Sequence, residues 1–400
     1  MSRKSCTLMS YHWARFSCPG SILALTGIVL LLLLVGAIFL LSSCNSPSTD
    51  LIVFETADPR QSEVASKAAA ADLQFGEIPD AFGNASDWPV RREQVARLIL
   101  EYLGEMPPEA PALEPQVLSE ERFDTYIRRK VSYQVQAGER VVAYLLLPID
   151  APLPRPAVLA LHQTVEQGKL EPIGIQGHPD MAYGLELVKH GFVVLAPDTI
   201  TAGDRLEPGQ LYYDTAKFDL AHPRWSAMGK MLWDHRRGLD YLQTLAEVDP
   251  NRIGVIGHSL GGYNALFLAA FDERIKVTVT SCAYTRIQTD PGKERWSRSA
   301  GFVHFPKLRP YVVPEATLEI PWDFHHVLSL VSPRAIFQSV ALDDSGFPNS
   351  ITVAQVHMQV LPLYQYQNSA GKLTSFFYDG GHGFPGFARK TAYDFLLSNL

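Results

Sequence analysis

From residue 156 to its end, the chain alternates short apolar runs with longer stretches whose apolar residues recur at helical spacing. The short runs predict buried strands at residues 157–161, 192–196, 253–256, 275–280, 335–340 and 374–378. The stretches between them predict helices at residues 181–190, 225–245, 350–366 and 387–397. Continuous apolar strands that alternate with helices are typical of a parallel sheet covered by helices on both faces.

The residues before this region predict that the domain begins with a helix and antiparallel strands. Residues 88–103 carry their apolar side chains on one helical face. Residues 123–147 contain two or three short apolar segments around a turn at Gly138, which predict antiparallel strands. We therefore expect one α/β domain over residues 86–400, with a mostly parallel central sheet, antiparallel opening strands and helices on both faces.

The chain begins with a basic segment, followed by an uncharged, leucine-rich run at residues 21–41. That run is long enough to span a bilayer, and its basic flank predicts that the body of the chain is exported. It ends in a Leu-Ser-Ser-Cys sequence at Cys44, which resembles the lipobox of bacterial lipoproteins, where the cysteine is lipidated. Residues 1–44 are therefore interpreted either as a lipoprotein signal or as an uncleaved membrane anchor. Residues 45–85, rich in Ser, Ala, Asp and Pro, predict a flexible tether.

A Gly-His-Ser-Leu-Gly sequence at residues 257–261 stands between a predicted strand and an apolar helical run. A strand, a sharp turn and a helix around such a sequence are typical of a nucleophile elbow. The turn holds the serine in a strained backbone conformation, and its flanking positions must lack bulk because strand and helix nearly touch there. Ser259 is therefore the candidate nucleophile, and Gly257 and Gly261 are the residues that make room for it.

A serine nucleophile needs a base that takes its proton and an acid that orients the base. In this type of site the chain order is serine, acid, histidine. His382 lies in a glycine-rich loop after the last predicted strand and is the candidate base. The acid is expected after the preceding predicted strand, where Asp343 and Asp344 are adjacent.

The oxyanion of the reaction needs two backbone donors. One is the amide of Leu260, directly after the nucleophile, and the other is expected in the loop after the strand at residues 157–161. We assign the second donor to Gln163, with its neighbours His162 and Thr164 as alternatives.

Composition and charge exclude some classes of protein. The chain is 46% hydrophobic, carries a formal net charge of -7 and has no basic run, which argues against a nucleic-acid partner. Cys282 is the one cysteine beyond residue 44, and it is predicted to be a buried apolar side chain. No Cys/His pattern has the spacing of a zinc site, so we expect no metal.

Residues 283–322, rich in Arg, Pro and aromatics, predict either a lid over the site or an excursion packed on its own aromatic side chains.

From about residue 88 onward the chain resembles the α/β-hydrolase superfamily, and within it the dienelactone-hydrolase-like and acetyl-xylan-esterase-like branch. The resemblance is carried by the elbow and by the segments at residues 161–172, 321–325, 332–334, 343–345 and 381–384. It implies the α/β-hydrolase fold, and it implies that the acid is the aspartate directly before Ser345, which is Asp344, with Asp343 as the alternative. Two departures count against particular substrates. Ser259 stands where dienelactone hydrolases have a cysteine, and Leu260 stands where glucuronoyl esterases have an arginine.

Together these residues predict a serine carboxylic-ester hydrolase that works through an acyl-enzyme and needs no metal or organic cofactor. The expected partner is a small-molecule or carbohydrate ester, and the expected location is a membrane surface outside the cytoplasm. A serine peptidase of the same fold and a non-catalytic binding protein are the alternatives. The serine at the elbow disfavours epoxide-opening and dehalogenating enzymes, which use an aspartate nucleophile.

Overall fold

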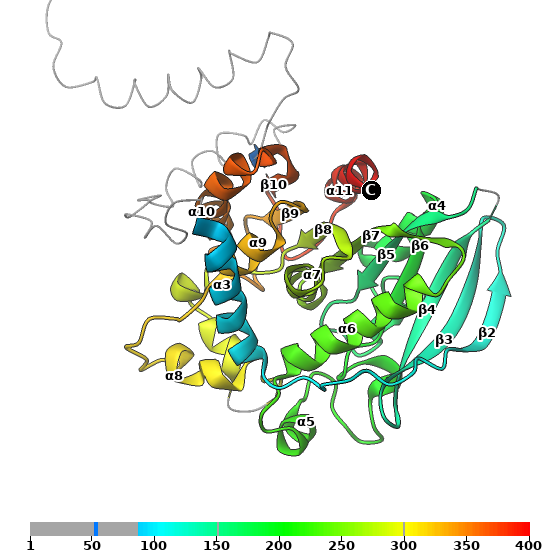
Figure 1. The fold of residues 1–400 in the computed structure, drawn as a ribbon, viewed down its shortest axis with the longest axis horizontal. Coiled ribbons are helices and arrows are strands. Elements are labelled where there is room, and N and C mark those ends of the chain that lie inside the picture. Colours follow the sequence, from blue (N-terminus) through cyan, green and yellow to red (C-terminus); the bar gives the residue numbers. More distant parts are fainter. Residues whose placement is uncertain (1–51, 55–86, 150–151, 299–300) are drawn as a thin grey trace, which may run out of the picture. The chain divides into compact units, whose positions relative to one another are not determined.

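A computed structural model describes residues 52–54, 87–149, 152–298 and 301–400. The predicted anchor, Cys44 and most of the predicted tether lie outside these residues. The described residues build a ten-stranded sheet (Figure 1). In spatial order its strands are β1 (Ile52–Phe54), β10 (Leu373–Tyr378), β9 (Ala335–Ala341), β8 (Ile275–Ser281), β7 (Val248–His258), β5 (Arg155–Leu161), β6 (Val193–Pro197), β4 (Glu139–Pro148), β3 (Tyr126–Gln136) and β2 (Gln116–Arg122).

The sheet is parallel from β1 to β6 and antiparallel from there to β2. The strands of the parallel part are fully or almost fully buried where the apolar runs predicted them. The predicted fold class, a mostly parallel sheet with antiparallel opening strands, is therefore confirmed. Because parallel neighbours share a direction, the carboxyl ends of β5, β7, β8, β9 and β10 lie along one edge of the sheet.

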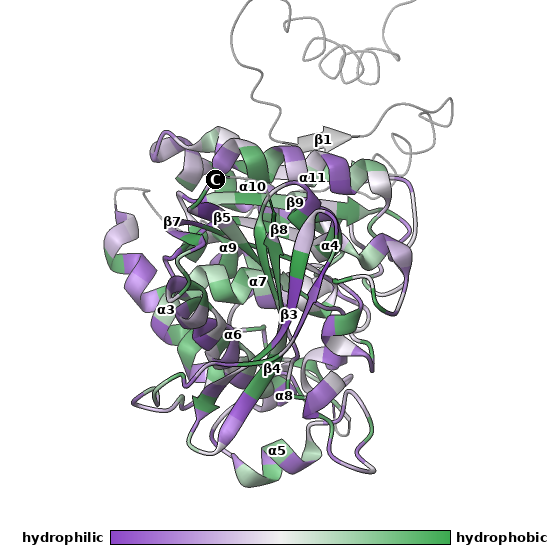
Figure 2. Ribbon diagram, turned by 90° about the vertical axis from the view of Figure 1, so that its right-hand side faces the viewer, coloured by the Kyte–Doolittle hydropathy of each residue, from purple (hydrophilic) through white to green (hydrophobic). Residues whose placement is uncertain are grey.

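Helices cover both faces of the sheet (Figure 1). One face carries α3 (Trp88–Leu103), α6 (Ala227–Gln243), α7 (Leu260–Phe271), α9 (Phe324–Val331) and α10 (Thr352–Tyr366). The other face carries α4 (Tyr183–Lys189) and α11 (Gly386–Asn399). Each set closes its own apolar core against the strands, and Figure 2 shows the central strands and α7 as the most apolar elements. Two short helices, α5 (Ala216–Ala221) and α8 (Arg309–Val312), lie in connecting segments.

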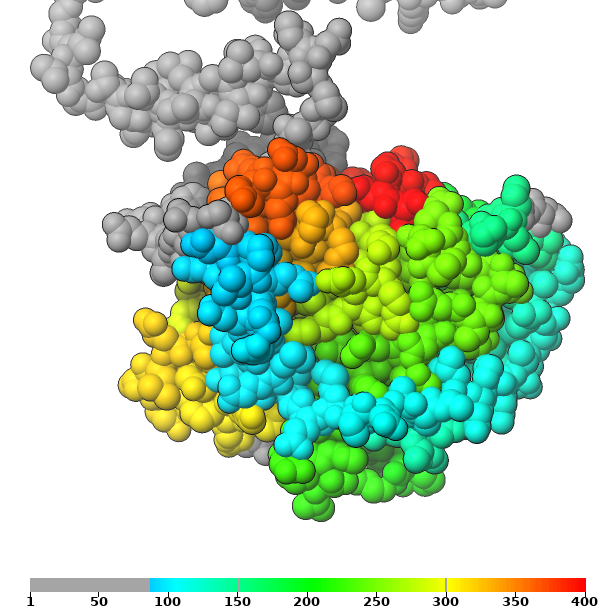
Figure 3. Space-filling view, viewed as in Figure 1, coloured from blue at the N-terminus to red at the C-terminus, as the bar shows by residue number. Residues whose placement is uncertain are grey.

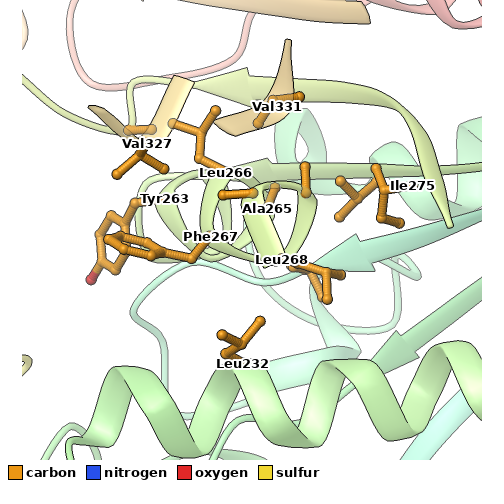
Figure 4. Packing of buried hydrophobic residues seen from close by; sticks show 14 of the residues in the cluster. Leu232, Tyr263, Ala265, Leu266, Phe267, Leu268, Ile275, Val327 and Val331 are labelled. Atoms are coloured by element: carbon orange, nitrogen blue, oxygen red, sulfur yellow. The ribbon is translucent and has the colours of Figure 1, made fainter. Parts of the chain in front are cut away.

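Helix α7 is apolar on all sides because all sides of it are covered. Every residue from Leu260 to Ala270 is buried, between the strands, α6 and α9. Figure 4 shows Leu266 beside Val327 and Val331 of α9, and Leu232 of α6 on the opposite side of the helix. The helix that follows the elbow is therefore one of the most rigidly held elements of the domain.

The N-terminal part differs in one respect from its prediction. Residues 52–54, inside the range predicted as a tether, form β1 and pair in parallel with β10. A three-residue strand has too few positions to produce a recognisable alternation, so the sequence gives no signal for it. Among the residues that the structure describes, no helix is long and apolar enough to cross a membrane. The division into anchor, tether and catalytic domain stays a prediction.

A buried ion pair joins the loop after β5 to the loop after β6. The Lys169 ammonium donates a hydrogen bond to the Asp198 carboxylate, and it also lies 2.8 Å from Asp204 Oδ2. The backbone N–H of Lys169 donates to Asp198 Oδ1 at 2.8 Å. The side chains of Lys169 and Asp198 are almost completely inaccessible to solvent. Because charge that is buried costs free energy unless it is paired, this contact holds both loops in one arrangement.

We predict that Lys169→Met lowers the free energy of unfolding by about 3–5 kcal/mol, because it leaves the Asp198 carboxylate buried without its cation. The matched control is Lys390→Met, which removes an exposed pair with Asp394 (2.7 Å) and should cost less than about 1 kcal/mol. Urea unfolding of both variants measures the difference. Equal losses would contradict the structural role of the buried pair.

Candidate active site

Ser259 occupies the sharp turn between β7 and α7. Its φ of 51° and ψ of -116° are unusual for a residue other than glycine. Its backbone is fixed on both sides, since its N–H donates to Ser281 O (2.8 Å) and its carbonyl accepts from Gly262 and Tyr263 at the start of α7. Strain of this kind, about 1–3 kcal/mol, persists only where the surroundings enforce it.

The glycines beside Ser259 allow the strand and the helix to touch. A Cβ on Gly257 would come within 2.2 Å of the Gly261 carbonyl, and a Cβ on Gly261 would come within 2.0 Å of the Leu161 carbonyl. Both distances are below any van der Waals contact, and the obstructing atoms are backbone atoms that cannot rotate away. The close approach also sets the elbow directly against the end of β5, where the predicted oxyanion loop begins.

His382 and Asp344 come together at the same edge of the sheet. His382 Nδ1 lies 2.7 Å from Asp344 Oδ1, although the two residues are separated by 38 positions. An ionised carboxylate can only accept hydrogen bonds, so the proton lies on Nδ1 and Nε2 is left as the basic nitrogen. The His382 ring lies 4.7 Å, between centroids, from the ring of His258, which precedes Ser259.

Asp344 has the surroundings of a carboxylate that remains ionised. Its Oδ1 also accepts from the N–H groups of Gly346 (2.7 Å) and Phe347 (2.9 Å). Burial alone raises the pKa of Asp344, but the hydrogen bond from His382 and the backbone donors outweigh it and lower the pKa below its ordinary value. Asp343, the alternative acid, is exposed, and its N–H donates to Gly380 O.

Two residues that hold His382 gave no catalytic signal in the sequence. Gly346 lies against the imidazole, where a Cβ would come within 2.8 Å of the ring. His258 is fully buried, its Nδ1 lies 3.0 Å from Ser281 Oγ, and burial followed by the neighbouring His382 lowers its pKa to about 3. His258 is therefore a neutral ring that packs on His382.

The predicted oxyanion loop is tied down by hydrogen bonds. His162 Nε2 accepts from the Thr199 N–H (3.1 Å), so His162 carries its proton on Nδ1 and donates it to Gln163 O at 2.6 Å. The Gln163 side chain donates to the buried Glu171 (3.0 Å). On the other side of the site, Leu260 is the first residue of α7, where backbone N–H groups have no acceptor within the helix.

Gln163 and Leu260 line the same narrow pocket. Apart from the His162 imidazole, its other walls are hydroxyl-bearing or apolar, and none of its described lining residues is a lysine or an arginine. These residues are His162, Thr164, Val165, Thr199, Thr201, Ala202, Tyr212 and Tyr213. Tyr213 has a φ of 60°, stacks on Phe302 at 4.4 Å between ring centroids, and has its hydroxyl 3.3 Å from His304 Nε2.

The segment at residues 283–322 supplies Phe302 and His304, which contact Tyr213. Its aromatic side chains other than Tyr311 are buried, and several pack on α7, as in the contacts of Trp296 with Tyr263 (5.2 Å) and of Trp322 with Phe267 (5.9 Å). Figure 3 shows the residues around α8, in yellow, beside α3, in blue and cyan, where Tyr102 contacts Trp322. The segment thus packs on the domain and also buttresses Tyr213 through Phe302 and His304. It combines features of both predicted alternatives.

Cys282 is buried, as expected, and follows β8. Burial is the main cause that raises the pKa of its thiol to about 12, and the nearby Asp344 adds to it. A thiol that is protonated in this way is a poor nucleophile. Its neighbours, however, are the candidate acid and base, which its position in the sequence does not indicate.

Comparisons with known proteins find similar esterases and hydrolases. A family model described as "Glucuronyl esterase, fungi" matches residues 216–366, which include the elbow and Asp344. The Bacillus subtilis (strain 168) protein named "Putative hydrolase YtaP" is 28% identical over 284 residues, which cover 70% of this chain and 89% of that protein. A glucuronoyl esterase from Solibacter usitatus superposes with a TM-score of 0.63 at 19% identity, over 80% of this chain and 94% of that one.

The chain has the α/β-hydrolase fold, and over residues 216–366 it is similar to a family of carboxylesterases. A "putative acetyl xylan esterase" from Bacteroides fragilis has the same fold, with a TM-score of 0.58 at 18% identity over 81% of this chain and 83% of that one. The resemblance seen in the sequence is confirmed at this level. In this fold the elbow, the loop after β5 and the loops after β9 and β10 meet at the carboxyl edge of the sheet.

We predict that Gly261→Ala abolishes most esterase activity and lowers the free energy of unfolding by about 1–3 kcal/mol or more, because its Cβ overlaps the Leu161 carbonyl. Gly371→Ala is the matched control, since a Cβ there has no heavy atom within 4 Å, and it should change stability by less than about 0.5 kcal/mol. Chemical denaturation and ester hydrolysis measure both effects. An unchanged Gly261→Ala enzyme would refute the steric account of the elbow.

Proposed function

We propose that this protein hydrolyses carboxylic esters of carbohydrates with Ser259 as nucleophile, His382 as base and Asp344 as the residue that orients the base. The observation that carries the proposal is the 2.7 Å hydrogen bond from His382 Nδ1 to Asp344, which leaves Nε2 free to accept a proton. It is supported by the contact between the rings of His382 and His258, the residue next to the nucleophile.

In the proposed reaction Ser259 Oγ attacks the acyl carbon while His382 Nε2 takes the hydroxyl proton. The amides of Leu260 and Gln163 stabilise the negative charge that forms on the carbonyl oxygen. Collapse of the tetrahedral intermediate breaks the bond to the alcohol, and His382 returns the proton to that leaving group. A water molecule then attacks the acyl-enzyme by the same steps and releases the acid.

The substrate class rests on the relatives and on the pocket. The matching family and the similar structures are named as glucuronoyl and acetyl xylan esterases, which act on carbohydrate esters. These names leave two arrangements, with the sugar on the acyl side or on the alcohol side. The neutral pocket beside Gln163 and Leu260, with no cation among its described lining residues, favours a small uncharged acyl group on a carbohydrate alcohol.

We also propose that the enzyme works outside the cytoplasm, held at a membrane by a lipid on Cys44 or by the apolar run at residues 21–41. The support is the sequence: a basic flank, a long apolar run and a cysteine at its end. Globomycin treatment of expressing cells distinguishes the two anchors, since it blocks lipoprotein signal cleavage and changes the mass of the mature chain only in the first case.

We predict that Ser259→Ala abolishes labelling by a serine-directed fluorophosphonate and hydrolysis of p-nitrophenyl acetate, because the probe and the ester both need the same nucleophile. Ser398→Ala, an exposed serine on α11, is the control and should label like the unmodified protein. Labelling of Ser259→Ala at the unmodified rate would refute the nucleophile assignment.

We predict that the enzyme prefers acetyl over butyryl esters, and that Tyr213→Ala raises the butyryl-to-acetyl ratio of kcat/KM by about tenfold, because it removes a wall of the pocket. The butyryl-to-acetyl ratio of kcat/KM does not change if part of the variant enzyme is unfolded, because both rates fall by the same factor. Tyr366→Ala, an exposed tyrosine on α10, should leave the ratio unchanged. Faster hydrolysis of a methyl uronate ester than of an acetylated sugar would place the sugar on the acyl side and refute the small-acyl assignment.

A further inference from the structure

Three side chains of types that can bind metal ions converge at the proposed acid–base pair. A sulfur of Cys282, a carboxylate oxygen of Asp344 and an imidazole nitrogen of His382 all lie within 4.8 Å of one another. They come from three different segments, after β8, β9 and β10, and meet because those strands end at one edge of the sheet. Cys282 and Asp344 are buried and His382 is partly exposed, so the cluster has one face open to a solute.

The fold fixes the thiol in this place. The Cys282 backbone has a φ of 45°, and its N–H donates to Ser339 O at 2.9 Å. Its sulfur lies 3.4 Å from Gly383 O, directly after His382, and 3.7 Å from the Tyr378 hydroxyl. Asp344 Oδ2, the carboxylate oxygen that does not face His382, is buried and makes no hydrogen bond of ordinary geometry within the described residues.

The donor set suits a soft divalent cation. Thiolate, imidazole and carboxylate are the usual ligands of Zn²⁺, and thiolate gives selectivity against hard cations such as Mg²⁺. Ligand atoms around a tetrahedral Zn²⁺ are about 3.5 Å apart, given metal–ligand distances of about 2.0–2.3 Å. To enclose the ion, the 2.7 Å separation of His382 Nδ1 and Asp344 Oδ1 would widen by about 0.8 Å, and separations as long as 4.8 Å would shorten by about 1.3 Å.

We propose that Zn²⁺ or Cd²⁺ binds between Cys282, Asp344 and His382 and thereby reversibly inhibits the enzyme. This inference rests on the proposed roles of His382 and Asp344. On binding, the Cys282 thiol loses its proton to solvent and forms a bond from sulfur to the metal. The Nδ1 lone pair of His382 forms a second bond, and the proton of Nδ1 moves to Nε2. His382 then has no free nitrogen to accept the Ser259 proton, and Asp344 no longer orients it.

The test is a titration of the full chain with CdCl₂ in a buffer free of thiols and chelators. Esterase activity and the ultraviolet charge-transfer absorption of the sulfur–cadmium bond are both followed. The expected result is that activity falls and absorption rises over the same concentration range, that EDTA reverses both, and that MgCl₂ produces neither. The absorption measures binding even if the protein proves not to be an esterase, so failure of the proposed function is distinguishable from failure of this inference.

Cys282→Ser and Cys282→Ala supply the decisive comparison, each scored against its own metal-free activity. Both should need at least about tenfold more Cd²⁺ for half-inhibition and should lack the part of the absorption that Cys282 contributes. The other cysteines of the chain are unchanged in these variants, so they cancel in the difference spectrum. Inhibition of the variants at the unmodified concentration, or inhibition without the Cys282-dependent absorption, would overturn the proposal.

Discussion

The close approach of backbone to backbone at the elbow is the constraint on which the site depends. Gly257, Gly261 and the Leu161 carbonyl are packed so tightly that no Cβ fits between them. That contact brings the end of β7, the start of α7 and the loop after β5 into one place. The candidate nucleophile and both predicted oxyanion donors are thereby brought together by the same backbone packing.

The second half of the site depends on the parallel sheet. Asp344 and His382 follow neighbouring strands, so their loops emerge at the same edge and their side chains meet at 2.7 Å. Backbone donors and a histidine on one carboxylate oxygen keep Asp344 ionised in spite of its burial. The free-energy cost of burying the Asp344 charge is thus offset by hydrogen bonds, and the one from His382 also fixes the direction of the imidazole.

Much of this fold could be predicted because burial imposes periodicity on the sequence. The helix predicted at residues 88–103 has these bounds in the structure, and the apolar runs of the parallel sheet lie in the predicted strands. Strand β2 was not predicted, because all seven of its residues are exposed and no alternation marks it. Strand β1 is too short to leave a pattern.

The candidate site likewise has a part that could be predicted from the sequence and a part that could not. Residues fixed by a strand end and a turn, such as Ser259 and His382, could be located from local sequence. Contacts between distant segments could not, because nothing in the chain indicates that Lys169 pairs with Asp198, that Tyr213 stacks on Phe302, or that Cys282 lies beside the candidate acid and base. These contacts depend on loops whose paths follow from packing rather than from any local pattern.

The central claim is that Asp344 acts only through His382, and a double-mutant cycle on kcat/KM tests it most directly. Asp344→Asn, His382→Ala and the double variant are compared with the unmodified enzyme on one ester. The account predicts that the double variant is no slower than His382→Ala, within about threefold, since the acid has no function once the base is absent. Losses that multiply, so that the double variant falls below His382→Ala by the full Asp344→Asn factor, would contradict it.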